Sequence, residues 1–148
     1  MAVAGLSPGD FYITRHSNLS EVHVVFHLVS DDSVSNTASD LTSRHAIIAA
    51  CRNVLKLCFR YDIRHVTIPL LLVHDMTEDM TMQWCLKRAE LVFKCIKGFV
   101  MELALWTGQE AFTIQFLVPK GLSDEAFVSI STMLPTIFRM SNPVIAKS

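Results

Sequence analysis

The chain has 148 residues, which is about one domain and enough to bury a sizeable core. Apolar residues make up 51% and charged residues only 18%, against roughly 25% charged in an ordinary soluble domain, and the net charge of −1 offers no long-range attraction to nucleic acid or to an anionic membrane. No stretch approaches the roughly 18 uninterrupted apolar residues of a membrane span, so we expect a soluble, cytosolic domain without membrane insertion. The low content of charged residues indicates either a sheet covered on both faces or an apolar surface that meets a partner.

Two strands are predicted near the N-terminus, Phe11–His16 and Glu21–Val29. The second is largely apolar on both of its faces, which is typical of a strand covered on both sides. The next segment, Ser30–Ser43, reads SDDSVSNTASDLTS and has no periodicity. We expect residues 30–43 to form a mobile surface connection.

An amphipathic pattern then predicts a helix over Ala46–Arg60. The near-continuous apolar run Arg64–Val73 is typical of a buried parallel strand, although Pro69 removes one ladder donor near its end. A long helix is predicted over Glu78–Leu105, and the pair Asp75 and Glu78 fits a cap at its start.

The last predicted strand is Phe112–Val118, again apolar on both faces. Ser123 is predicted to cap a final helix, which Pro135 should kink or shorten because it lacks a backbone N–H. Asn142-Pro143 is expected to end the structure.

The resulting order, β-β-α-β-α-β-α, predicts an α/β fold with three layers, α-β-α, around a mixed, mainly parallel sheet. We expect a flexible N-terminus over residues 1–9, a single domain over 10–140 and a C-terminal tail over 141–148.

In such sheets ligands bind beyond the carboxyl ends of the strands, which draws attention to the loop Pro69–Thr81 and its run His74–Asp79. One histidine and three acids lie in that run, so a metal site or acid–base chemistry is conceivable, but no second histidine stands at a ligand spacing and helix capping is the simpler role for the acids. A phosphate cradle needs glycines, and the run has none. We assign no catalytic, cofactor-binding or metal-binding residue and expect no cofactor. The loop is instead a candidate contact for a partner or ligand through His74, Asp75, Met76, Glu78, Asp79 and Trp84.

Two further groups of residues have an ordinary structural interpretation. The cysteines lie among apolar neighbours with no CxxC pair, which favours reduced thiols that act as small hydrophobes; they are Cys51, Cys58, Cys85 and Cys95. A basic stripe is expected on the solvated faces of the two longer helices, with nucleic-acid contact as the alternative; it comprises Arg52, Lys56, Arg60, Lys87, Arg88, Lys94 and Lys97.

Several long strings of this sequence resemble the C-terminal region of the FERRY complex subunit 3 family. They are Tyr12–Val24, Ile68–Thr81, Trp84–Cys95 and Gln115–Pro119. The resemblance implies a non-enzymatic subunit of a five-subunit assembly, an effector of an early-endosomal Rab GTPase that links mRNAs and ribosomes to endosomes. It also implies other protein subunits as partners, RNA reached only indirectly, and a cytoplasmic location on early endosomes through those partners. Self-association is left open.

A weaker resemblance, to the C-terminal half of a macro domain, runs from Arg52–Leu55 to Ile68–Pro69. It implies a degenerate macro-like fold and, as the alternative function, binding of a nucleotide or an ADP-ribose derivative. The family's phosphate loop contains glycine, whereas this sequence has Leu70–Asp75 there, so no ADP-ribose-binding residue is carried over. If the chain is a piece of a longer protein, its strands would need partners from outside it.

Overall fold

The structure, a computed structural model, describes residues 5–15, 24–31, 34, 41–107, 112–139 and 145–147. The elements follow in the order β1 (Phe11–Thr14), β2 (Val25–Leu28), α1 (Ala46–Arg60), β3 (His65–Pro69), α2 (Met82–Thr107), β4 (Thr113–Val118), α3 (Asp124–Phe138) and β5 (Ile145–Lys147). The predicted order is confirmed as far as α3, and the predicted bounds of α1 are those observed. The predicted strand residues His16 and 21–23 lie outside the described residues.

The main sheet is parallel and has the strand order β3-β4-β5. Ile68 lies opposite Phe116, and Phe116 lies opposite Ile145 on the other side of β4. The prediction that the structure ends at Asn142-Pro143 is therefore wrong, because β5 follows it. A strand this short carries almost no pattern of its own, and its pairing with β4 is a long-range contact that local periodicity does not report.

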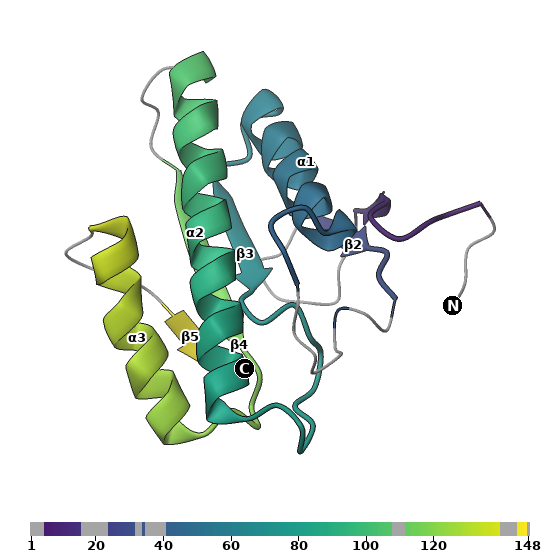
Figure 1. Cartoon of the computed structure of the whole chain (residues 1–148). Coiled ribbons are helices and arrows are strands. Elements are labelled where there is room, and N and C mark those ends of the chain that lie inside the picture. Colours follow the sequence, from purple (N-terminus) through teal and green to yellow (C-terminus); the bar gives the residue numbers. More distant parts are fainter. Residues whose placement is uncertain are drawn as a thin grey trace.

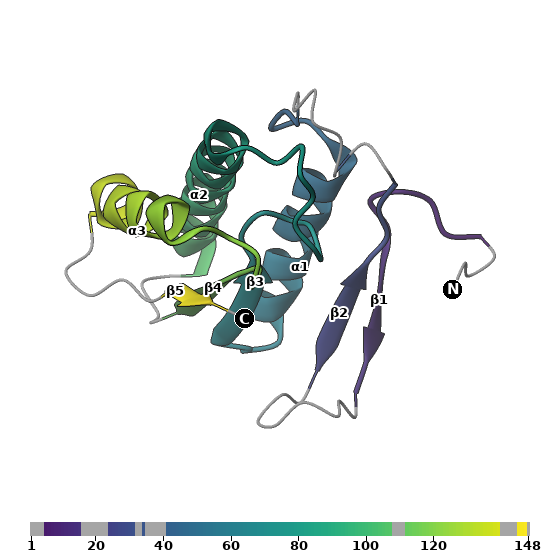
Figure 2. The same cartoon turned by 90° about the horizontal axis from the view of Figure 1, so that it is seen from below.

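The described part of the chain forms two layers where three were predicted. Figures 1 and 2 show α2 and α3 over one face of the sheet, with α1 beside α2 near β3, and no described element on the opposite face. Strand side chains alternate between the two faces. Val66 and Ile68 turn toward the helices, whereas Thr67 is exposed and contacts Gln115 on the uncovered face, with 3.4 Å between Oγ1 and Oε1. The outward positions of β3 and β4 are thus largely polar, which a second helical layer would not tolerate.

The first two strands form a separate antiparallel hairpin, β1 with β2, that is not part of the main sheet. Tyr12 and Ile13 are exposed, and β2 is half-buried along its length. On this hairpin Tyr12 stacks on His27, with ring centroids 4.5 Å apart. β2 was predicted to be covered on both sides, whereas all four of its residues are half-buried, so neither side is fully covered by described residues.

The core lies between the helices and the sheet. Phe93 of α2 is fully buried and meets Phe116 of β4 and Phe138 of α3 edge-on, at centroid distances of 5.0 and 5.9 Å. Ile48 of α1 and Ile130 of α3 extend the same cluster on either side. Burial of each such side chain stabilises the fold by about 1.5–3 kcal/mol relative to exposure.

The segment 30–43, predicted to be a mobile surface connection, is described at residues 30, 31, 34 and 41–43; the rest lies outside the described residues. Val34 and Leu41 are buried in the core, so the expected surface position is wrong for these two residues. Both are apolar residues in an otherwise polar stretch, and each fills space against the helices.

The two later helices differ from their predicted form in one detail each. α2 begins at Met82 and not at Glu78. α3 begins as predicted, with the Ser123 hydroxyl oxygen accepting from the Ala126 N–H at 3.2 Å, but it runs through Pro135 to Phe138 without being shortened there. Because Pro135 lies in the last turns of α3, the backbone bond that it cannot make is one of the last in the ladder.

Candidate functional site

The loops that follow β3 and β4 meet at the carboxyl end of the sheet, where the sequence placed the candidate site. Gly121 lies so close to Met76 that a β-carbon at residue 121 would stand 3.1 Å from the Met76 β-carbon. The two loops enclose a cavity of about 230 Å³, lined by Met76, Thr77, Met80, Met82, Cys85, Gly121, Leu122, Ser123 and Ala126. Its described lining contains no carboxylate.

The six predicted site residues are not brought together. His74, Asp75, Glu78 and Asp79 are exposed to solvent, whereas Met76 turns toward Gly121. Trp84 is buried on α2 and lines a different cavity. Within the described residues no group of three or more His, Cys, Asp or Glu side chains is arranged to hold a metal ion.

The predicted cap of α2 by Asp75 and Glu78 is wrong. The Thr81 hydroxyl oxygen accepts from the Trp84 N–H at 3.2 Å, and the Thr81 carbonyl accepts from the Cys85 N–H at 3.0 Å. Thr81 is therefore the capping residue, and no acid lies in the first turn of the helix. The acidic pair has the spacing of a capping box but lies one turn too early.

The apolar run after Pro69 ends the strand and does not extend it. Leu70 and Leu71 are fully buried, yet the chain turns there, with the Leu72 N–H donating to the Pro69 carbonyl at 3.2 Å. Leu72 has a φ of +58°, in the left-handed region that favours glycine. A buried turn and a buried strand have the same apolar composition, which is why the sequence did not separate them.

Arg88 is the residue that the sequence placed most wrongly. It was assigned to the solvated stripe, but its side chain is 4% exposed and is the one buried charge among the described residues. Its guanidinium donates to the Leu71 carbonyl at 2.9 Å and to the Val34 carbonyl at 2.7 Å. It thus ties the turn after β3 and the segment before α1 to α2, which no local pattern could reveal.

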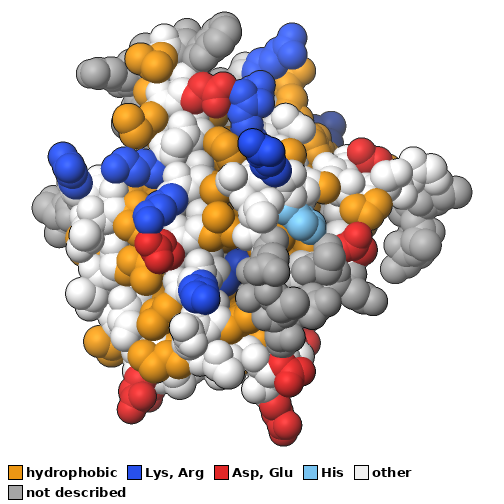
Figure 3. Space-filling model, in the orientation of Figure 1, with side chains coloured by type: hydrophobic (Ala, Val, Ile, Leu, Met, Phe, Trp, Pro, Cys, Tyr) orange, Lys and Arg blue, Asp and Glu red, His pale blue; other side chains and the backbone are white. Residues whose placement is uncertain are grey.

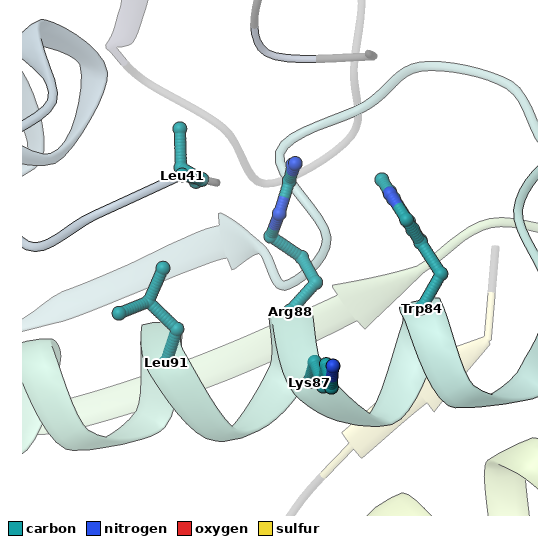
Figure 4. A pocket seen from close by; sticks show the side chains of 5 residues that line it. All are labelled: Leu41, Trp84, Lys87, Arg88 and Leu91. Carbon is teal, nitrogen blue, oxygen red and sulfur yellow. The ribbon is translucent and has the colours of Figure 1, made fainter. Parts of the chain in front are cut away.

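Trp84 lies one helical turn before Arg88, and the guanidinium carbon is 4.5 Å from the centre of its ring, within the range of a cation–π contact. Trp84 is 5% exposed, and its indole Nε1 is buried without a hydrogen-bond partner among the described residues. Figure 4 shows both side chains extending from the same side of α2 toward Leu41. They line a cavity of about 120 Å³ together with Leu41, Lys87 and Leu91.

The charge of Arg88 has no carboxylate partner among the described residues. Burial lowers the pKa of Arg88 to about 10, so the guanidinium remains protonated at neutral pH. Two backbone carbonyls and an aromatic face compensate the charge only partly, because a buried cation is ordinarily paired with an anion.

The remaining basic residues lie on the helices, as predicted, but two of those described are paired. Arg52 of α1 forms an ion pair with Glu102 of α2, and this hydrogen bond holds the pKa of Glu102 below its ordinary value. Lys94 pairs with Glu90 one turn away on α2. Figure 3 shows lysine and arginine side chains spread over the helices between hydrophobic ones, with acidic side chains at the lower edge of the molecule.

The prediction of free thiols is confirmed, since all four cysteines are free and three of them are buried. Burial raises the pKa of Cys51 and of Cys58 to about 11. Such thiols are weak nucleophiles at neutral pH. No described helix combines the length and the apolar composition needed to cross a bilayer.

Fold and site together define a class: a small two-layer α/β domain whose described residues show neither a metal cluster nor a carboxylate in the two cavities described above. The sequence profile of the family described as Ferry endosomal RAB5 effector complex subunit 3 matches residues 2–144, and the chain belongs to that family.

Curated relatives agree with this assignment. Proteins named FERRY endosomal RAB5 effector complex subunit 3 from Rattus norvegicus and from Homo sapiens are each 57% identical over 141 residues, 95% of this chain. The chain spans 25% of the length of these relatives. No solved structure is significantly similar to it.

Proposed function

We propose that the chain is a non-enzymatic interaction domain of a FERRY-type endosomal Rab5 effector complex. The observation that carries the proposal is the family membership: the family profile matches residues 2–144, and proteins named as subunits of that complex are 57% identical over 141 residues. A subunit of an assembly needs surfaces for other proteins, whereas it needs no reacting groups of its own.

The geometry supports a role without catalysis. The titratable side chains of the loop after β3 are exposed, and the described linings of the two cavities hold no pair of acid–base groups. A general base or a nucleophile is recognised by hydrogen-bonding reach to a second catalytic group, and the described loop residues offer no such pair.

Within this proposal the partners are the other protein subunits. Light scattering on the purified chain would show whether the chain also associates with itself. The complex would link mRNAs and ribosomes to early endosomes, this chain would reach RNA only through its partners, and it would reside in the cytoplasm on endosomes. The link to mRNAs and ribosomes, the indirect RNA contact and the endosomal location come from the family resemblance. The near-neutral net charge of −1 agrees with indirect RNA contact.

We place one partner contact on the exposed loop after β3. His74, Asp75, Glu78 and Asp79 make no hydrogen bond that caps the following helix, so the three acids are free of the structural role that the sequence gave them. Exposed acids that do not support their own fold are available to a basic surface of a partner.

The alternative function, binding of a nucleotide or an ADP-ribose derivative, finds no support in the cavities. Their volumes of about 120 and 230 Å³ fall below the roughly 300–1,000 Å³ of small-molecule sites. In a thermal-shift assay with ADP-ribose, we expect no change, whereas saturating ligand would stabilise a true binder by about 2.7 kcal/mol at a hundredfold excess over Kd.

Affinity purification of the tagged chain from cytosol, followed by mass spectrometry, tests the proposal. We expect other subunits of the complex to co-purify, and recovery of the chain alone would contradict it. The triple replacement Asp75→Asn, Glu78→Gln and Asp79→Asn should reduce their recovery if the loop is a contact. Glu90→Gln, on the exposed side of α2, is the matched control and should leave recovery unchanged.

A further inference from the structure

We propose that the cavity beside Arg88 and Trp84 is a recognition pocket for one acidic side chain, Asp or Glu, of a partner protein. The proposal rests on the proposed function, which it deepens by naming what the partner must present. The pocket lies on the side of α2 that faces Leu41, beside the buried turn at Leu71.

The pocket contains more hydrogen-bond donors than acceptors. A guanidinium has five N–H bonds, and among the described residues Arg88 uses two of them, on the Leu71 and Val34 carbonyls. The Trp84 Nε1–H on the same cavity has no acceptor among the described residues. A buried donor left without an acceptor is destabilising, so an oxygen that enters the cavity and accepts from it relieves a penalty already present in the fold.

The charge of the pocket selects an anion. The Arg88 guanidinium has no carboxylate partner among the described residues, and Lys87 adds a second, exposed positive charge at the rim. Arginine binds carboxylates through two parallel N–H bonds, a geometry that a single lysine does not reproduce.

The size and the walls of the pocket select a side chain over a larger ligand. The volume of about 120 Å³ is roughly four times the share of one water molecule in the liquid. That space accommodates a carboxylate and its methylene groups but not a nucleotide. Leu41 and Leu91 form apolar walls, which suit the methylenes of Asp or Glu better than they suit a free, fully hydrated anion.

The test is a titration of the 15N-labelled 148-residue chain, followed by NMR through the indole N–H signals. The probe is a short Gly/Ser peptide with one central Glu, and its twin carries Gln in that place. Trp106→Phe leaves Trp84 as the one indole signal. We expect a saturable downfield shift of that signal with the Glu peptide and none with the Gln peptide.

Variants show whether the pocket is responsible. Arg88→Lys should abolish the shift. Because Arg88→Lys alters a buried residue, Trp84→Phe serves as a second variant. Peptide binding to it is followed through the backbone amide signals of Lys87 and Leu91. Lys87→Ala should weaken binding about two- to fivefold, as expected for an exposed charge. Lys94→Ala, which lies away from the cavity, should have no effect.

Three results would overturn the proposal. The first is an equal response to both peptides or no saturable response to either. The second is the same shift with acetate or inorganic phosphate at equal concentration, which would mark a site for free anions. The third is a change of the Trp84 signal on Asp32→Asn or Asp40→Asn without peptide, which would show that the chain supplies its own acid. The titration uses the isolated chain, so its failure and the failure of co-purification are separate results.

Discussion

Phe93 is the residue on which the packing of three elements depends. It belongs to α2, is fully buried, and meets one ring from the sheet and one from α3. Phe93→Ala should therefore lower the free energy of unfolding by about 3–5 kcal/mol, because the removed ring leaves a cavity that its neighbours fill only partly.

Chemical denaturation followed by circular dichroism measures that loss. Val128→Ala is the matched control, because Val128 is exposed and its truncation should change stability by less than about 0.5 kcal/mol. Equal midpoints for Phe93→Ala and the parent chain would show that the cluster is not packed as described.

The buried thiols give the stability of the chain a dependence on alkaline pH. The pKa of Cys51 and of Cys58 is raised by burial from 9.0 to about 11. The folded chain thus holds these protons more tightly than the unfolded chain does. Stability is complete below about pH 9 and falls as the pH rises toward 11, by up to about 1.4 kcal/mol for each unit of pKa difference at each thiol.

Urea midpoints at pH 7.5 and at pH 10 measure this effect in the parent chain and in the double variant Cys51→Ala, Cys58→Ala. The parent should lose more stability between the two pH values than the variant, since lysine and tyrosine titration is common to both. An identical loss in both chains would argue against burial of these thiols.

At the scale of elements, the start of α2 could be capped by Thr81 or by the pair Asp75 and Glu78. Thr81 accepts from the Trp84 N–H, whereas Asp75 and Glu78 lie before the helix. Thr81→Ala should cost about 1 kcal/mol, and Glu78→Gln less than about 0.5 kcal/mol. Thermal unfolding of the two variants decides between them; a larger loss for Glu78→Gln would restore the capping pair that the sequence indicated.

Elements that depend on local periodicity were predicted correctly, whereas features that depend on long-range contacts were not. α1 was predicted with its observed bounds because its apolar stripe repeats over four turns. β5 and the pairing of β4 with it were not predicted, since three residues carry no periodicity. The number of layers was overestimated because the overall apolar content outweighed the polar outward positions at Thr67 and Gln115.

The candidate site was predictable in position but not in composition. The parallel sheet did bring the loops after β3 and β4 together at its carboxyl end. Trp84 was named as a site residue, whereas Arg88 was assigned to solvent. The spacing of Arg88 on α2 is that of a surface residue. Arg88 is buried only because Val34 and Leu71 approach it from distant segments of the chain. The surplus of donors in that cavity is a property of the assembled fold.

At the scale of the whole molecule, one face of the main sheet and the exposed loop after β3 are uncovered by any described element, while the cavities are too small for a nucleotide. A domain with open faces and small cavities is suited to contacts with other proteins. The chain also spans 25% of the length of its curated relatives, so the activities of those longer proteins are proposals for this chain.

The most direct test of the central claim is the sedimentation of the tagged chain in a gradient of cytosolic extract. Membership of a multi-subunit effector complex predicts that the chain sediments together with other subunits, far ahead of a protein of 16.6 kDa. The triple loop variant should shift toward lighter fractions, and Glu90→Gln should not. Sedimentation of the parent chain as a single 16.6 kDa species, with no other subunit in its fractions, would contradict the account.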